Sequence, residues 1–167
     1  GVRSRSALPP PQCHGFRPPR LSVGAPETLE PLRALLAYRP RVVCGMDGLQ
    51  AMTLESGAER VLAAMNGMAA WPAVYAAAKA GLDIALANKE LAVAAGEILF
   101  AAAAASGARI LPVDSEHSAI FQCLEGELRS DARTVVLTAS GGPFWDFSIE
   151  EMRRATPAQA LRHPTWS

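Results

Sequence analysis

The stretch LDIALANKELAVAAGEILFAAAAASG, residues 82–107, contains the two patterns on which the fold of this chain depends. Its first six residues form a short apolar run that is typical of a buried β-strand. From Leu91 onward an alanine-rich segment predicts a helix, and Gly107 occupies the position after a helix end that glycine favours. A strand followed directly by a helix is the repeating unit of a parallel α/β sheet.

The same alternation continues on both sides of this stretch. Short apolar runs predict further strands at 41–46, 60–65, 109–113 and 133–140, of which RTVVLTAS at 133–140 is the clearest. Helical patterns lie between and around them, at 28–39, 71–81, 118–124 and from Ser148, where Ser148 and Glu151 have capping-box spacing. The sequence therefore predicts an α/β fold with a mostly parallel sheet.

Composition and charge restrict the class of protein. The chain has 167 residues, half of them apolar, and a net charge of zero, which fits one domain of ordinary size without the clustered basic face of a nucleic-acid binder. No apolar stretch approaches the ~18 residues of a membrane span, and no secretory signal pattern is present. Three widely spaced cysteines give no zinc or disulfide pattern. We therefore expect a cytoplasmic protein that binds neither nucleic acid nor membranes.

The first part of the chain has a different composition. Residues 1–27 carry four arginines and one glutamate, and the first 31 residues hold seven of the 13 prolines. Because proline removes a backbone donor and fixes φ, we expect residues 1–27 to be a disordered or extended leader, or sequence foreign to the fold.

Three polar clusters each follow a predicted strand: NKE at 88–90, DSEH at 114–117 and SGGPF at 140–144. In parallel sheets ligands bind at the carboxyl ends of the strands. One such cluster would only be a helix cap, whereas three that converge on one edge indicate a site.

Each cluster has two interpretations from its residues alone. Asp114 and Glu116, if extended, would point to one face about 6.6 Å apart and suit Mg²⁺ or Mn²⁺, or else Asp114 or Ser115 caps the following helix. Lys89 could meet a phosphate or a polarised oxygen, or be a solvated residue beside a capping Asn88. Ser140 with its glycines could cradle an anion or form a plain turn. His163, in a proline-bearing loop, could bind phosphate.

Taken together, the motifs resemble one family, the 1-deoxy-D-xylulose 5-phosphate reductoisomerases. Four segments match it in order and spacing, from about Thr28 to the end of the chain: AGLDIALANKELAV, LPVDSEHSAIFQCL, LTASGGPF and ATPAQALRHPTWS. The resemblance implies an incomplete Rossmann-like NADPH-binding domain at 28–111, leading into the start of an α+β catalytic domain at 112–167. It also implies conversion of 1-deoxy-D-xylulose 5-phosphate to 2-C-methyl-D-erythritol 4-phosphate in isoprenoid precursor synthesis, by a homodimer.

The resemblance assigns roles to individual residues. Asp114 and Glu116 would ligate Mg²⁺ or Mn²⁺, and Asn88 and Glu90 would face NADPH. The substrate, a sugar phosphate, would meet a larger set of side chains: Lys89, Ser115, Glu116, Ser140, His163 and Trp166, the last on a mobile loop.

This chain also departs from the family pattern. A GxTGSxG phosphate-binding turn and a MMNKGLE segment with a third metal-ligating glutamate are expected in the family and do not occur in the 167 residues. We therefore expect a fragment that is inactive and poorly soluble alone. The alternative is a naturally truncated, non-catalytic binding or dimerisation module.

Overall fold

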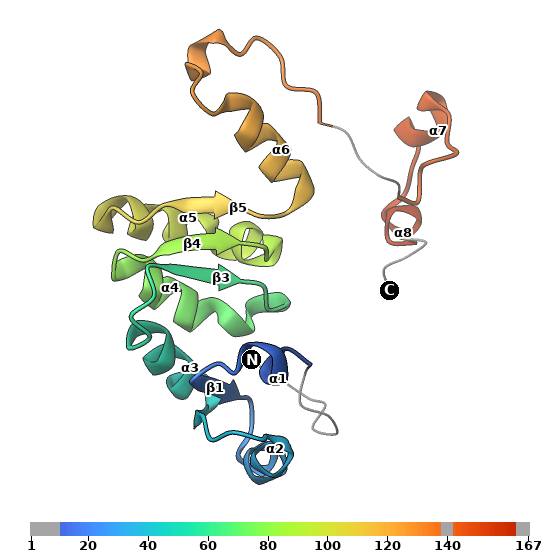
Figure 1. The fold of residues 1–167 in the computed structure, drawn as a ribbon. Coiled ribbons are helices and arrows are strands. Elements are labelled where there is room, and N and C mark those ends of the chain that lie inside the picture. Colours follow the sequence, from blue (N-terminus) through green and yellow to red (C-terminus); the bar gives the residue numbers. More distant parts are fainter. Residues whose placement is uncertain (1–10, 138–141, 163–167) are drawn as a thin grey trace. The chain divides into compact units, whose positions relative to one another are not determined.

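The computed structural model describes residues 11–137 and 142–162. The chain divides after Ser118 into two compact units, and each is described by itself. All the strands of the described residues lie in the first unit (Figure 1): β1 Arg20–Val23, β2 Arg41–Cys44, β3 Arg60–Ala63, β4 Asp83–Leu86 and β5 Ile110–Pro112.

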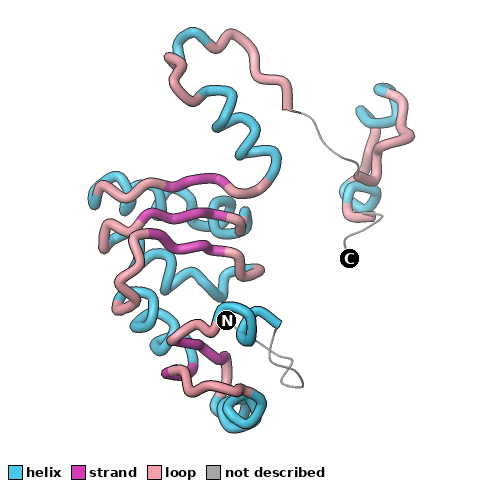
Figure 2. The backbone as a smooth tube through the Cα atoms, in the orientation of Figure 1, coloured by secondary structure: helices cyan, strands magenta, loops and turns pink. Residues whose placement is uncertain are grey.

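Helices connect these strands and make up the regular structure of the second unit (Figure 2). The α-helices are α1 Pro11–Phe16, α2 Leu29–Leu35, α3 Gly45–Leu54, α4 Trp71–Lys79, α5 Lys89–Ser106, α6 Ser115–Leu124, α7 Ile149–Arg153 and α8 Pro157–Ala160. The described residues also form three short 3-10 helices, η1 Pro26–Thr28, η2 Gly67–Ala70 and η3 Arg129–Asp131. Among the described residues, no helix combines the length and the apolar character that a membrane span requires.

All strand pairs in the described part of the chain are parallel. Strands β1 and β2 form one sheet, and β3, β4 and β5 form another in that order. Each pair is connected through a helix, since parallel neighbours cannot be joined by a tight turn. The α/β class and the parallel sheet predicted from the sequence are thus confirmed.

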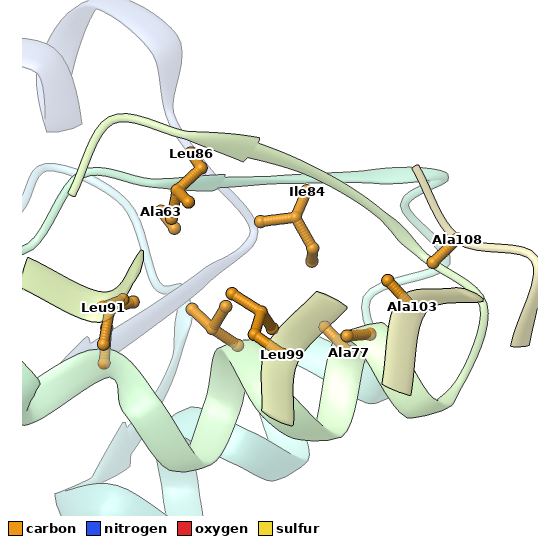
Figure 3. Packing of buried hydrophobic residues seen from close by; sticks show 11 residues of the cluster. Ala63, Ala77, Ile84, Leu86, Leu91, Leu99, Ala103 and Ala108 are labelled. Carbon is orange, nitrogen blue, oxygen red and sulfur yellow. The ribbon is translucent and has the colours of Figure 1, made fainter. Parts of the chain in front are cut away.

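The core lies on one face of the three-stranded sheet, where α4 and α5 cover it (Figures 1 and 3). Ile84 of β4 and Leu91 and Leu99 of α5 are fully buried. Ala77 on α4 is also fully buried, and its small side chain brings the helix close to its neighbours. Burying a side chain such as Leu99 contributes about 1.5–3 kcal/mol, so this cluster fixes the positions of β4 and α5.

Several helix-end signals act as the sequence predicts. Pro72 lies in the first turn of α4, and Gly107 ends α5 with φ +81°, a left-handed conformation that favours glycine. In the capping box of α7, the Glu151 N–H donates to Ser148 Oγ at 3.3 Å, and the Ser148 N–H donates to Glu151 Oε2 at 2.7 Å. Helix α5 has one interruption, at Ala95, whose φ of −145° is not helical.

The expectation of a disordered or extended leader, or of sequence foreign to the fold, is corrected for residues 11–27, because this stretch contains a helix and a strand that pairs within the first unit. Residues Pro11–Phe16 are helical, and Arg20–Val23 form β1 in register with Arg41–Cys44. The prolines at 18 and 19 precede the strand and therefore remove no hydrogen bond from its ladder. A prediction from proline content alone therefore misses the four-residue strand β1.

The strand predicted at 133–140 is not found in its described part. Residues 133–137 have no regular structure, and Val136 is 80% exposed. A strand is stabilised by a hydrogen-bonded neighbour, and the described residues supply none here. The remaining positions, 138–140, lie outside the described residues.

Candidate functional site

The turns that follow β3, β4 and β5 lie side by side at one edge of the sheet. The Ala87 N–H donates to Ala63 O at 3.0 Å, and the Val113 N–H donates to Leu86 O at 3.0 Å. These bonds extend the parallel ladders just past the strand ends. They bring the turn at 64–67, the start of α5 and the start of α6 to the same carboxyl edge.

Asn88 joins two of these turns. It is 3% exposed and caps α5, because its Oδ1 accepts the Leu91 N–H at 3.1 Å. Its Nδ2 donates to the carbonyls of Met65 and Gly67, the second at 2.8 Å. The predicted cap is confirmed, and it is accompanied by a connection to the turn after β3.

Asp114 caps α6. Its Oδ1 accepts the His117 backbone N–H at 2.9 Å, and the His117 ring Nδ1 lies 2.6 Å from each carboxylate oxygen. Partial burial raises the pKa of Asp114, but the His117 hydrogen bonds and the nearby Lys89 charge outweigh that effect and lower it. Asp114 is therefore held as a carboxylate.

Glu116 lies in the first turn of α6, beside Asp114. The Ser115 hydroxyl donates to its Oε2 at 2.8 Å, and this bond is the main reason why the pKa of Glu116 is lowered. The negative charge of Asp114 acts in the opposite direction, and the Lys89 ammonium partly offsets it. Lys89 thus lies close enough to act on both carboxylates, although it belongs to a different helix.

The extended geometry considered for residues 114–116 is not found, because α6 begins at Ser115 rather than near Ser118. The capping interpretation of Asp114 is the one that its hydrogen bonds show. Capping occupies one oxygen with a backbone N–H and leaves further lone pairs on the carboxylate. A cap and a metal ligand are therefore compatible roles for Asp114.

The structure brings together one part of the predicted site. The residues that meet at the carboxyl edge are Asn88, Lys89, Asp114, Ser115 and Glu116. Glu90 lies exposed in the first turn of α5. The predicted phosphate and loop residues Ser140, His163 and Trp166 lie outside the described residues.

The carboxylates fit a hard divalent cation by the chemistry of their donors. Mg²⁺ and Mn²⁺ prefer oxygen ligands, and both carboxyl groups have lowered pKa values. Within 11–137 and 142–162, no three His, Cys, Asp or Glu side chains are grouped to hold a metal ion. Asp114 and Glu116 would therefore be two ligands of a shell that needs others.

Sequence reasoning missed two contacts at this edge. The ring of His117 lies against Asp114, and the carbonyls of Met65 and Gly67 accept from Asn88. The i, i+3 spacing of Asp114 and His117 at a helix start was a usable signal for the first contact. No local pattern reveals the second, because it joins residues more than twenty positions apart.

A parallel sheet with helices packed on it, and with Lys89 and two carboxylates at its carboxyl edge, places the chain in the α/β class. Two family models match this chain. The 1-deoxy-D-xylulose 5-phosphate reductoisomerase model matches residues 2–96, and the model of that enzyme's C-terminal domain matches residues 110–167. The chain belongs to the 1-deoxy-D-xylulose 5-phosphate reductoisomerase family. The match begins at residue 2 rather than at the expected Thr28, so it includes most of the leader.

Relatives named 1-deoxy-D-xylulose 5-phosphate reductoisomerase are similar over nearly the whole chain. The protein of Thermosynechococcus vestitus is 44% identical over 160 residues, which cover 94% of this chain and 39% of that protein. The protein of Exiguobacterium sibiricum is 45% identical over 157 residues, covering 94% of this chain and 41% of that protein. The chain thus spans about two fifths of the length of these relatives.

Solved structures of the same name share the fold. The Zymomonas mobilis enzyme in complex with NADPH has a TM-score of 0.72 and 36% identity, covering 91% of this chain and 40% of that one. A reductoisomerase in complex with magnesium has a TM-score of 0.75 and 32% identity, covering 97% of this chain and 43% of that one. Another was solved with NADPH, fosmidomycin and magnesium, at a TM-score of 0.72 and 35% identity.

Proposed function

We propose that this chain is part of a reductoisomerase that converts 1-deoxy-D-xylulose 5-phosphate to 2-C-methyl-D-erythritol 4-phosphate with NADPH and Mg²⁺ or Mn²⁺. The observation that carries the proposal is that the starts of α5 and α6 meet at the carboxyl edge, where the Val113 N–H donates to Leu86 O at 3.0 Å and Lys89 lies near Asp114 and Glu116. Because the chain spans about two fifths of its relatives, the activity is proposed for the whole protein. We further propose that it acts as a homodimer in the cytoplasm, in isoprenoid precursor synthesis.

In this proposal the site residues divide between metal, substrate and cofactor. Asp114 and Glu116 hold the cation, while Lys89 and Ser115 contact the sugar phosphate together with Glu116. Ser140 and His163 bind its phosphate, and Trp166 lies on the loop that closes over it. Asn88 and Glu90 face NADPH at the start of α5.

The chemistry of these groups suits the rearrangement. A bound divalent cation would stabilise negative charge on the ketose oxygens. Lys89 would add a positive charge beside them at the N-terminus of α5, where the helix dipole also favours an anionic substrate. Since Asp114 and Glu116 already have lowered pKa values, they would bind the cation without first losing a proton at neutral pH.

The test compares two variants of the whole protein, Asp114→Asn and Glu116→Gln, in NADPH oxidation with 1-deoxy-D-xylulose 5-phosphate and in Mn²⁺ binding by calorimetry. Loss of a residue that hydrogen-bonds a metal ligand lowers metal affinity or activity roughly 10–100-fold. Loss of a ligand itself should therefore lower kcat/KM by a larger factor, and it should weaken Mn²⁺ binding to the same extent. The exposed Glu127→Gln is the matched control and should change neither.

Two results would overturn the assignment. Wild-type Mn²⁺ affinity in both variants would remove the metal role of these carboxylates. A wild-type protein that binds NADPH but turns over no substrate would favour the non-catalytic binding module.

A further inference from the structure

The Asn88 side chain is almost fully occupied by contacts within the protein. A carboxamide has two N–H donors and one carbonyl oxygen. Both carbonyl partners of Nδ2, Met65 and Gly67, belong to the turn after β3, and Oδ1 accepts the Leu91 N–H. With 3% of the residue exposed, only one lone pair of Oδ1 is left for any other group.

The two segments that Asn88 connects both border the carboxyl edge. One is the turn at 64–67, in which Gly67 has a φ of +65° and begins η2. The other is the first turn of α5, which carries Lys89 and is anchored in the core by the fully buried Leu91. The Asn88 carboxamide therefore sets the distance between the turn at 64–67 and Lys89 at the start of α5.

We propose that Asn88 is a positioning residue, which holds the turn at 64–67 against the start of α5, rather than a residue whose side chain binds NADPH. It acts through the carbonyls of Met65 and Gly67, and through the helix end that presents Lys89. Loss of the side chain would release the turn and so weaken ligand binding indirectly. The effect on NADPH depends on the proposed function, whereas the effect on the turn does not.

Two variants separate the capping role of Asn88 from its connection to the turn. Asn88→Ser keeps an oxygen that can cap α5, since serine is as good a capping residue as asparagine, but it has no pair of donors for the two carbonyls. Asn88→Ala removes both functions. Asn66→Ser is the matched control, because Asn66 lies in the same turn, is exposed and makes no capping bond with its side chain.

The first measurement is hydrogen exchange in the whole protein. In Asn88→Ser we expect the amides of 64–71 to exchange about tenfold faster, as for the loss of buried hydrogen bonds, while the Leu91 amide stays protected. In Asn88→Ala both regions should exchange faster, and in Asn66→Ser neither should. Unchanged exchange at 64–71 in Asn88→Ser would overturn the proposal.

The second measurement is the NADPH dissociation constant of the whole protein, with KM and kcat for the sugar phosphate. A positioning role predicts that Asn88→Ser weakens NADPH and lowers kcat together, because the turn and Lys89 both shift. Weaker NADPH binding with unchanged hydrogen exchange and unchanged kcat would indicate that the Asn88 side chain contacts NADPH directly, and it would overturn the inference. Absence of NADPH binding in every protein would instead refute the proposed function, and the exchange result would still decide the role of Asn88.

Discussion

At the scale of single residues, the strongest electrostatic feature lies at the amino end of β4, away from the candidate site. Asp83 accepts the Arg109 backbone N–H at 3.0 Å and the Arg109 Nε–H at 3.1 Å, and its Oδ2 lies 3.5 Å from Arg60 Nη2. The Arg109 side-chain hydrogen bonds are the largest cause that lowers the pKa of Asp83, from 3.8 to about 2. Asp83 thus connects the starts of three neighbouring strands.

This shift predicts how stability depends on pH. A carboxyl whose pKa is lower in the folded state stabilises the fold above its unfolded pKa and loses that contribution as the pH falls through the folded value. Asp83 should therefore stabilise fully above about pH 4 and progressively less toward about pH 2. In urea unfolding, the difference between wild type and Asp83→Asn should be largest at pH 7 and shrink below pH 4.

The control for this prediction is Glu30→Gln. Glu30 pairs with Arg33 at 2.8 Å, but its side chain is 79% exposed, and exposed pairs contribute little. The control should therefore match wild type throughout. A difference for Asp83→Asn that stayed constant from pH 7 to pH 2 would contradict the assigned shift.

At the scale of elements, α5 decides whether the three-stranded sheet keeps its cover. Leu99 is fully buried in the core, whereas Ile98, its neighbour on the same helix, is 56% exposed. Leu99→Ala should lower the free energy of unfolding by about 2–5 kcal/mol, because it leaves a cavity. Ile98→Ala should stay within about 0.5 kcal/mol of wild type. Equal losses in the two variants, measured by urea titration, would show that α5 does not pack as described.

Local sequence patterns predict those elements whose signal lies within the element itself. The strands β2, β3, β4 and β5 and the helix ends at Pro72 and Gly107 follow from periodicity and from proline and glycine preferences. The same rules did not predict β1, whose four residues are flanked by prolines. They predicted a strand that includes RTVVL at 133–137, where the structure has none. Strand pairing is a property of two segments, so one segment cannot reveal it.

The contacts of the candidate site also fall into those that local sequence patterns predict and those that they do not. Polar residues after strands identified the carboxyl edge, and the i, i+3 relation of Asp114 to His117 was within reach of the sequence. The contact of Asn88 with the turn after β3 was not, because its two ends are separated by a whole helix. Residue type predicted a helix cap for Asn88 and the family resemblance implied contact with NADPH, whereas its burial and hydrogen bonds add a connection to the turn after β3.

At the scale of the whole molecule, the exposed apolar residues at 135–137 affect behaviour in solution. Val136 is 80% exposed in a strand-prone sequence without a partner strand among the described residues. Such segments promote association between chains, and an added charge opposes it. In the 167-residue chain, Val136→Lys should lower concentration-dependent association several-fold, as measured by light scattering.

Val93→Lys provides the comparison for that experiment. Val93 is 86% exposed, but it lies on α5, where helical hydrogen bonds already occupy the backbone. Its replacement should therefore change association much less. Equal effects of the two lysines would show that added charge, and not the strand-prone segment, controls association.

The two ends of the short strand β4 have different roles, one in stability and one in the proposed site. Its amino end carries the ion pairs of Asp83, and the turn beyond its carboxyl end carries Asn88 and Lys89. In the proposed function, substitutions around Asp83 leave the ligand-binding edge unchanged, whereas those around Asn88 alter it. Among descendants of a common ancestor, the two ends of this one strand should therefore diverge at different rates.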